Sequence, residues 1–136
     1  MITSDGFFEL EDQPKRVMII GSGYIAVELA GIFKALGTEV VLSIRYDKVL
    51  RKFDDFLSDF TTEELKKTGI KIIPFTQLKS VSKCESGLKV ELDSRKTPGE
   101  TQTLEGFNQV LCAVGRAPNT ADIALNKTVR LLPLCL

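Results

Sequence analysis

The segment Gly21-Ser22-Gly23-Tyr24-Ile25-Ala26 constrains the fold of this chain most strongly. It follows a short apolar run at residues 17–20 that predicts a strand, and a stretch compatible with a helix comes after it. In such a strand-to-helix turn, Gly21 takes the tight turn, Gly23 lets a pyrophosphate approach the backbone, and Ala26 lets the helix lie close to the strand. The free N–H groups and positive dipole end of the helix then face the phosphates. The segment predicts a dinucleotide-binding turn; the alternative is a tight turn without a ligand.

The next predicted strand, at residues 39–44, indicates which dinucleotide would bind, after Gly37 has closed the preceding helix. At the end of this strand an acidic residue accepts hydrogen bonds from the 2′-hydroxyl of NAD, whereas an arginine accommodates the 2′-phosphate of NADP. Ile44 and Arg45 stand where the acid would be, and Arg51 follows six residues later. Because two guanidinium groups can clamp one phosphate, the pair predicts NADPH as the ligand. The alternative is two solvated surface arginines.

Tyr46 lies next to Arg45 in the same predicted loop. Its ring can lie against the adenine face of the cofactor, or it can be a half-buried anchor of the loop. Both interpretations place an aromatic ring beside the expected 2′-phosphate.

Composition argues against several other classes of function. Eighteen basic residues balance eighteen acidic ones, so no global field favours nucleic acid or an anionic membrane. No segment is typical of a signal peptide or a membrane span. Cys84, Cys112 and Cys135 are too widely spaced for a redox Cys-x-x-Cys pair or a zinc site, which indicates reduced thiols in a cytosolic protein. The sequence has no histidine, so we expect no metal site and no catalysis by this chain alone.

The pattern beyond residue 53 predicts the rest of one α/β domain. Asp54 and Asp55 open a second helix that runs to about Thr68 and ends at Gly69. A third strand is expected at residues 70–74. The buried face of the second helix is predicted to hold Phe56, Leu57, Phe60 and Leu65.

A β-meander is expected where a doubly wound sheet would continue with another crossover helix, because residues 76–105 alternate as strands do. Residues 107–115 then return to the parallel sheet as a buried strand that ends at Gly115. The predicted fold class is α/β, a Rossmann-like doubly wound parallel sheet with a β-meander in place of one crossover helix, and residues 13–45 form its β-α-β phosphate-binding unit. The expected meander strands are residues 78–84, 88–93 and 101–104, with a turn at 85–87 and the returning strand at 107–114.

Four segments in order carry a resemblance to a known family: residues 3–8, residues 21–31, Ile44-Arg45 with residues 49–54, and Ala113-Val114-Gly115-Arg116-Ala117-Pro118-Asn119-Thr120. The last of these is specific. Together they resemble the two-dinucleotide-domain flavoprotein disulfide reductases, the class I pyridine nucleotide-disulfide oxidoreductases. The resemblance implies that residues 1–126 are the central NADPH-binding domain of such a protein and that residues 127–136 are a tail outside the family pattern.

The resemblance also implies roles for individual residues. Arg45 and Arg51 match the pair that holds the 2′-phosphate, and Tyr24 matches the aromatic residue that gates access of the nicotinamide to the flavin. Glu28 matches a carboxylate paired with a lysine beside the flavin. From its position alone, Glu28 can equally be a solvated residue in the middle of a helix.

The segment after the returning strand is the remaining candidate. Gly115 would approach the nicotinamide half of the cofactor from the carboxyl edge of the sheet, and Arg116 would lie beside it. The alternative is that residues 115–118 only end a strand in a turn. The residues expected to bind the cofactor are Gly21, Ser22, Gly23, Tyr24, Ile25, Glu28, Arg45, Tyr46, Arg51, Val114, Gly115 and Arg116.

The family pattern further implies a larger parent protein. A complete reductase of this type needs an FAD-binding domain, a redox disulfide and an interface domain with a His-Glu pair, and this sequence holds none of them. We therefore expect a fragment of a cytoplasmic or mitochondrial homodimer that binds NADPH, uses FAD only in the complete protein, and reduces no disulfide alone. The disulfide substrate stays open. Two alternatives are a stand-alone nucleotide sensor and an interaction domain that has lost the ligand.

Separation from the missing domains should also leave apolar surface exposed. The apolar tail at residues 131–136, which contains Cys135, adds to it. We therefore expect concentration-dependent self-association that reductant partly reverses.

Overall fold

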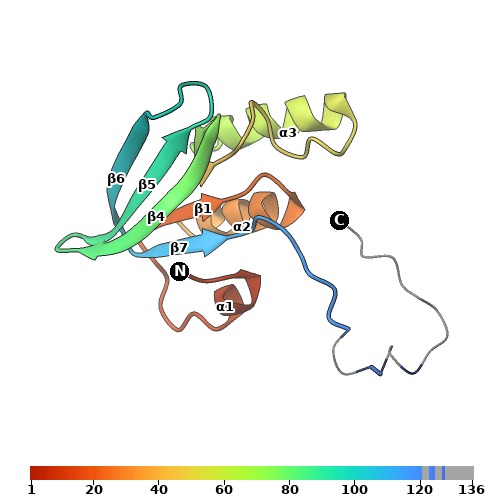
Figure 1. Cartoon of the computed structure of the whole chain (residues 1–136), viewed down its shortest axis with the longest axis horizontal. Coiled ribbons are helices and arrows are strands. Elements are labelled where there is room, and N and C mark those ends of the chain that lie inside the picture. The colour runs from red at the N-terminus through yellow and green to blue at the C-terminus, as the bar shows by residue number, and fades with distance from the viewer. Residues whose placement is uncertain (121–122, 125–126, 128–136) are drawn as a thin grey trace.

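A computed structural model describes residues 1–120, 123–124 and 127 (Figure 1). The predicted non-family tail and Cys135 fall almost wholly outside the described residues. Within those residues no helix is long and apolar enough to cross a membrane. The elements in chain order are α1 (Ser4–Phe8), β1 (Arg16–Ile20), α2 (Tyr24–Ala35), β2 (Glu39–Ser43), α3 (Asp55–Lys67), β3 (Lys71–Ile73), β4 (Thr76–Cys84), β5 (Gly87–Ser94), β6 (Thr101–Phe107) and β7 (Gln109–Cys112).

The strands form two sheets of different type. Strands β3, β2, β1 and β7 lie in that order in one sheet, and each neighbouring pair is parallel. Strands β4, β5 and β6 form an antiparallel meander, which lies beside the parallel sheet in Figure 1. The meander links β3 to β7 where another crossover helix would otherwise stand. The predicted fold class is therefore confirmed.

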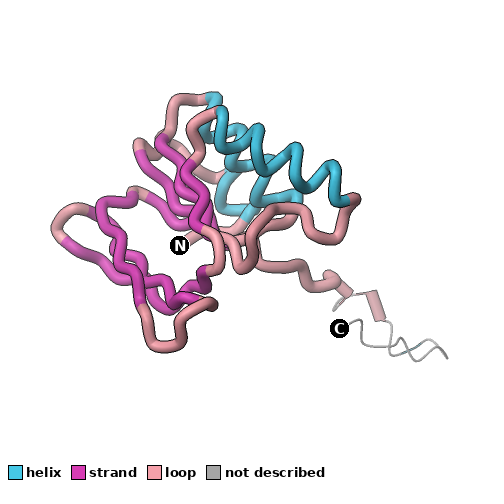
Figure 2. The backbone as a smooth tube through the Cα atoms, turned by 90° about the horizontal axis from the view of Figure 1, so that it is seen from above, coloured by secondary structure: helices cyan, strands magenta, loops and turns pink. Residues whose placement is uncertain are grey.

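Side chains that alternate along the parallel strands pack against two different layers. In β1, Val17 and Ile19 belong to the core cluster that α2 and α3 complete, whereas Met18 and Ile20 belong to the cluster that the meander completes. All four of these side chains are buried. Figure 2 shows the helices gathered on one side of the strands. The parallel sheet is therefore the middle layer, and both of its faces are covered, as is usual for parallel sheets.

The helix ends lie close to where the sequence predicts them. Gly37 and Gly69 follow α2 and α3 and have φ angles of +92° and +84°, the left-handed conformation that glycine adopts most readily after a helix. Asp54 is the N-cap of α3, and its side chain accepts a hydrogen bond of 2.9 Å from the backbone N–H of Phe56.

The boundary between the meander and the returning strand differs from the prediction. Phe107 ends β6, pairs with Leu88 in the antiparallel sheet and is fully buried beneath the meander. Asn108 separates β6 from β7, and its side chain accepts a hydrogen bond of 2.8 Å from the backbone N–H of Arg16. The returning strand β7 begins only at Gln109, because at Asn108 a side chain rather than a backbone carbonyl accepts from the N–H of Arg16. It ends at Cys112 and not at the predicted Gly115, because its partner strand β1 ends at Ile20.

The predicted buried face of α3 is wrong for three of its four residues. Leu65 is buried, but Phe56, Leu57 and Phe60 are 73%, 48% and 57% exposed. The side chains that α3 buries are Ser58, Thr62 and Leu65, which are spaced as one helical face. The reason is that a loop lies between α3 and the sheet edge, and its backbone needs hydrogen-bonding groups rather than phenyl rings.

Candidate nucleotide-binding site

The glycine turn between β1 and α2 has one closed side and one open side. Gly21 has a φ of +138°, and a Cβ added to it would lie 2.3 Å from the carbonyl oxygen of Ala113, so no other residue fits there. Its N–H donates a hydrogen bond of 3.0 Å to the carbonyl of Ser43. A Cβ added to Gly23, in contrast, would meet no atom within 4 Å. The turn is therefore fixed against β7 and β2 behind, and its front is free for a ligand.

The N-terminus of α2 faces this open side without a protein cap. Gly23 is the N-cap and has no side chain to cap the first N–H groups of the 12-residue helix. Ala26, in the first turn, is fully buried and lets the helix lie close to the strand. Uncapped N–H groups at the positive end of a helix suit an anion, so the residues present fit the pyrophosphate of a dinucleotide.

Tyr24 and Arg116 come together across the carboxyl edge of the sheet. The guanidinium Nη1 of Arg116 donates a hydrogen bond of 2.7 Å to the hydroxyl of Tyr24. Val114 is 61% exposed, and Gly115 and Arg116 are exposed as well. The first turn of α2 therefore meets the segment that follows β7, two regions that the sequence prediction assigned to the nicotinamide half of a cofactor.

The remaining candidates on α2 differ in exposure. Ile25 is half-buried and packs against the helix-side core. Glu28 is exposed. It lies four residues after Tyr24 and therefore on the same face of the helix.

The loop that follows β2, residues 45–54, presents the two predicted arginines; we call it the arginine loop. Ile44 is 1% exposed and belongs to the core, so Arg45 is the first side chain after the strand that reaches solvent. The guanidinium carbon of Arg51 lies 3.5 Å from the centre of the Tyr46 ring. The position that would read the ribose therefore carries cations and an aromatic ring instead of a carboxylate.

The arginine loop is tied to the glycine turn by its backbone. The N–H of Leu50 donates a hydrogen bond of 2.7 Å to the carbonyl of Ser22. Leu50 has a φ of +54°, a conformation that few residues other than glycine adopt. This strained residue lies next to Arg51, and the bond fixes the distance from Arg51 to the turn.

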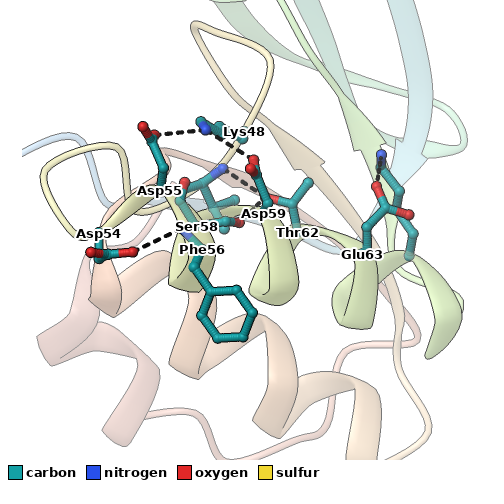
Figure 3. A network of polar contacts seen from close by, with 10 residues as sticks. Lys48, Asp54, Asp55, Phe56, Ser58, Asp59, Thr62 and Glu63 are labelled. Carbon is teal, nitrogen blue, oxygen red and sulfur yellow. Dashed lines mark hydrogen bonds and ion pairs between the residues drawn. The ribbon is translucent and has the colours of Figure 1, made fainter.

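Two buried hydroxyls of α3 hold the other side of the arginine loop. The N–H of the fully buried Val49 donates to the hydroxyl of Thr62 at 3.1 Å, and the hydroxyl of Ser58 donates to the carbonyl of Val49. The hydroxyl of Thr62 in turn donates to the carbonyl of Ser58 at 2.7 Å. Figure 3 shows both hydroxyl residues beside the loop.

Two ion pairs with α3 hold Lys48, another residue of the arginine loop. Its ammonium group lies 2.9 Å from a carboxylate oxygen of Asp55 and 2.9 Å from one of Asp59 (Figure 3). The hydrogen bond from Lys48 holds the pKa of Asp55 below its ordinary value, and the two carboxylates raise the pKa of Lys48 above its own. The sequence prediction did not include Lys48, Ser58 or Thr62. Only the spacing of Ser58 and Thr62, two hydroxyl residues four positions apart, could have indicated that these two share a helix face.

The two thiols in the described residues have no contact in this arrangement. Cys84 and Cys112 are free and half-buried. They lie in different sheets, in β4 and β7.

Comparison with known proteins identifies the family. The family model for pyridine nucleotide-disulphide oxidoreductases matches residues 1–131. The chain is 47% identical over 134 residues to a glutathione reductase of Schizosaccharomyces pombe, which is 97% of this chain and 28% of that protein. It is also 47% identical over 127 residues to a glutathione reductase of Debaryomyces hansenii, which is 92% of this chain and 24% of that protein.

A solved structure agrees with this assignment. An engineered water-forming NADPH oxidase bound to NADPH has a TM-score of 0.74 and 27% identity, over 95% of this chain and 27% of that one. The chain thus spans 28% and 24% of the lengths of its two glutathione reductase relatives. It belongs to the pyridine nucleotide-disulphide oxidoreductase family.

Proposed function

We propose that this chain is the NADPH-binding domain of a glutathione reductase and that the rest of the parent protein supplies the FAD and interface domains. The observation that carries the proposal is the arginine loop. It holds Arg45 and Arg51 next to an uncapped glycine turn, after a strand end that carries Ile44 instead of an acid. The relatives at 47% identity, both named glutathione reductase, support the choice of parent.

The engineered NADPH oxidase supports the preference for NADPH through its substitutions. An aspartate is replaced by alanine, the next residue becomes arginine, and a second arginine is introduced six positions after the first. This chain has Ile44, Arg45 and Arg51 at the same spacing. A glycine 18 positions before the replaced aspartate becomes alanine in the oxidase, and Ala26 lies 18 positions before Ile44. That protein binds NADPH, and its changes agree with what this sequence carries.

The residues of this chain would bind and orient the cofactor. The N-terminus of α2 would take the pyrophosphate, and Arg45 and Arg51 would take the 2′-phosphate through charge-assisted hydrogen bonds. Tyr24, held by Arg116, would stand over the nicotinamide half and control access to it. NADPH supplies the hydride, which in the complete protein passes through FAD to glutathione disulfide.

A nucleotide titration of the 136-residue chain tests the binding role. We expect tighter binding of NADPH than of NADH in calorimetry. In the Arg45→Met and Arg51→Leu variants each lost contact should cost about 1.5 to 3 kcal/mol, roughly ten- to a hundredfold in NADPH affinity. Lys52→Met, which removes an exposed charge from the same loop, is the matched control and should change little. Equal affinity of the wild type for the two nucleotides would overturn the 2′-phosphate assignment.

A chimera tests the choice of parent protein. Replacing the matching region of the fission yeast glutathione reductase with this chain should retain NADPH-dependent reduction of glutathione disulfide, because the two sequences are 47% identical over 134 residues. The isolated chain should carry no flavin absorption band and reduce no disulfide. A chimera that binds both cofactors but does not reduce its flavin with NADPH would contradict the choice of a glutathione reductase as parent.

Two other functions remain alternatives. A stand-alone NADP(H) sensor would bind NADPH as tightly but would fail in the chimera. A pure interaction domain would bind neither nucleotide.

A further inference from the structure

Two arginines from separate parts of the chain converge on the ring of Tyr46. The guanidinium carbon of Arg51 lies 3.5 Å from the ring centre, and that of Arg95 lies 5.2 Å from it. Arg51 belongs to the arginine loop, whereas Arg95 follows β5 in the connection to β6. Both distances are within the range of a cation–π interaction, in which the face of an aromatic ring attracts a cation.

Arg95 is held at this place by contacts that do not depend on Tyr46. Its backbone N–H donates a hydrogen bond of 2.8 Å to the carbonyl of Phe75, and its guanidinium contacts the amide oxygen of Gln77 at 3.3 Å. The N–H of Phe75 in turn donates to the carbonyl of Tyr46 at 3.3 Å. The meander connection is therefore fixed against the start of the arginine loop.

The result is that two guanidinium groups lie at the exposed ring of Tyr46, and Arg45 directly precedes Tyr46 in the chain. Arg45, Arg51 and Arg95 are all exposed, and none of them forms an ion pair in the part of the chain that the structure describes. Cations gathered in this way repel one another, and the repulsion is relieved when a multivalent anion binds between them. A phosphate monoester is the anion whose charge and acceptor geometry suit several guanidinium groups.

We propose that Arg95 is a third cation of the 2′-phosphate site. Tyr46 is a positioning residue, whose ring orients Arg51 toward the 2′-phosphate. The proposal rests on the proposed function. It assigns the ring of Tyr46 to the arginines rather than to the adenine. It also makes the β-meander part of the nucleotide site, so that specificity for the 2′-phosphate depends on both sheets of the molecule.

Three variants of the 136-residue chain test the proposal by calorimetric titration with NADPH and, in parallel, with NADH. Tyr46→Leu removes the aromatic face and should weaken NADPH binding about three- to tenfold. Tyr46→Phe keeps the face and should restore the affinity to within about twofold. Arg95→Met should weaken NADPH binding about two- to fivefold. NADH binding should be the same in all three, because NADH lacks the 2′-phosphate. Lys83→Met, an exposed cation of the meander outside this cluster, is the control.

The outcomes separate this proposal from the proposed function. If the wild type prefers NADPH and both Tyr46→Leu and Arg95→Met retain the full preference, the proposed function stands and this inference fails. An equal loss of NADPH and NADH binding in these variants would also overturn it, since that result means a structural role. If the wild type shows no preference, both proposals fail. Arg95 is exposed, so Arg95→Met decides the question even if Tyr46→Leu does not fold.

Discussion

The two long helices on the same face of the parallel sheet are built in opposite ways. Helix α2 buries Ala26, Leu29, Ala30 and Phe33 against the sheet and leaves its N-terminus uncapped. Helix α3 buries Ser58 and Thr62, exposes three large apolar side chains and closes its N-terminus with Asp54. The comparison shows that α2 packs directly on strands, whereas α3 packs through Ser58 and Thr62 on a loop and reaches the sheet-side core only through Leu65. A loop presents unpaired N–H and C=O groups, and only polar side chains can satisfy them when they are buried.

Removing the largest buried side chain of α2 should have the largest effect on stability. Phe33 is 2% exposed and contacts the ring of Phe7 edge-on at 5.0 Å between ring centres. We expect Phe33→Ala to lower the free energy of unfolding by about 3 to 5 kcal/mol. Urea unfolding followed by circular dichroism measures it. Ile32→Ala, at the neighbouring exposed position, should cost far less, and equal costs would contradict the assigned buried face.

Removing a buried hydroxyl of α3 should lower the stability by less but should also weaken NADPH binding. Thr62→Val leaves the buried N–H of Val49 without its acceptor, which should lower the free energy of unfolding by about 1 to 3 kcal/mol. NADPH affinity should fall as well, because the arginine loop loses an anchor. Thr61→Val makes the same change one residue earlier and is the control. A loss of stability without any loss of NADPH affinity would show that this anchor does not position the arginines.

The ion pair of Asp55 should give a smaller, pH-dependent effect. Folding lowers the pKa of Asp55, so its contribution is present above the ordinary aspartate pKa of about 3.9 and is lost as the pH falls through the lowered value. We expect Asp55→Asn to lower the Tm slightly at pH 7, and the difference from the wild type should shrink as the pH falls below about 3.9. Asp47→Asn, which removes an exposed carboxylate of the arginine loop, serves as control. A Tm difference that grows toward low pH would contradict the sign of the shift.

Changing the exposed face of α3 should affect stability least. Phe56 and Phe60 stack on each other at 6.2 Å between ring centres, but they face solvent. We expect Phe56→Ser with Phe60→Ser to change the free energy of unfolding by less than about 0.5 kcal/mol. The same variant should reduce the concentration-dependent self-association that exposed apolar surface promotes.

Light scattering over a dilution series, with and without reductant, measures this association. Deleting residues 130–136 should reduce it further. A wild-type chain that is monomeric at high concentration would show that neither the phenylalanines nor the tail drives association.

Local rules account for the parts of the fold that the sequence predicted. The turn at Gly21, the left-handed glycines at Gly37 and Gly69 and the N-cap at Asp54 each depend on a few neighbouring residues, and all are confirmed. The meander followed from strand-like alternation in the same way.

The remaining parts depend on contacts between distant segments, and periodicity cannot reveal those. The apolar period of α3 indicates which face is apolar, but not that a loop lies between the helix and the sheet. The hydroxyls of Ser58 and Thr62 became informative only once Val49 was placed against them. Arg95 likewise reaches Tyr46 only because the meander folds back. The roles of individual residues in binding a cofactor stay predictions.

The pairing of β1 with β7 imposes an order on the folding of a newly made chain. Val17 pairs with Gln109 in the parallel sheet, so the central strand lacks one neighbour until residues 109–112 have left the ribosome. The carbonyl of Ala113, against which Gly21 closes, arrives later still. Pairings between residues so far apart in sequence form slowly, because a long loop must close first. The nucleotide can therefore act as a ligand only once the residues through Ala113 have been made, and a chain truncated before β7 would keep its glycine motif yet offer no finished site.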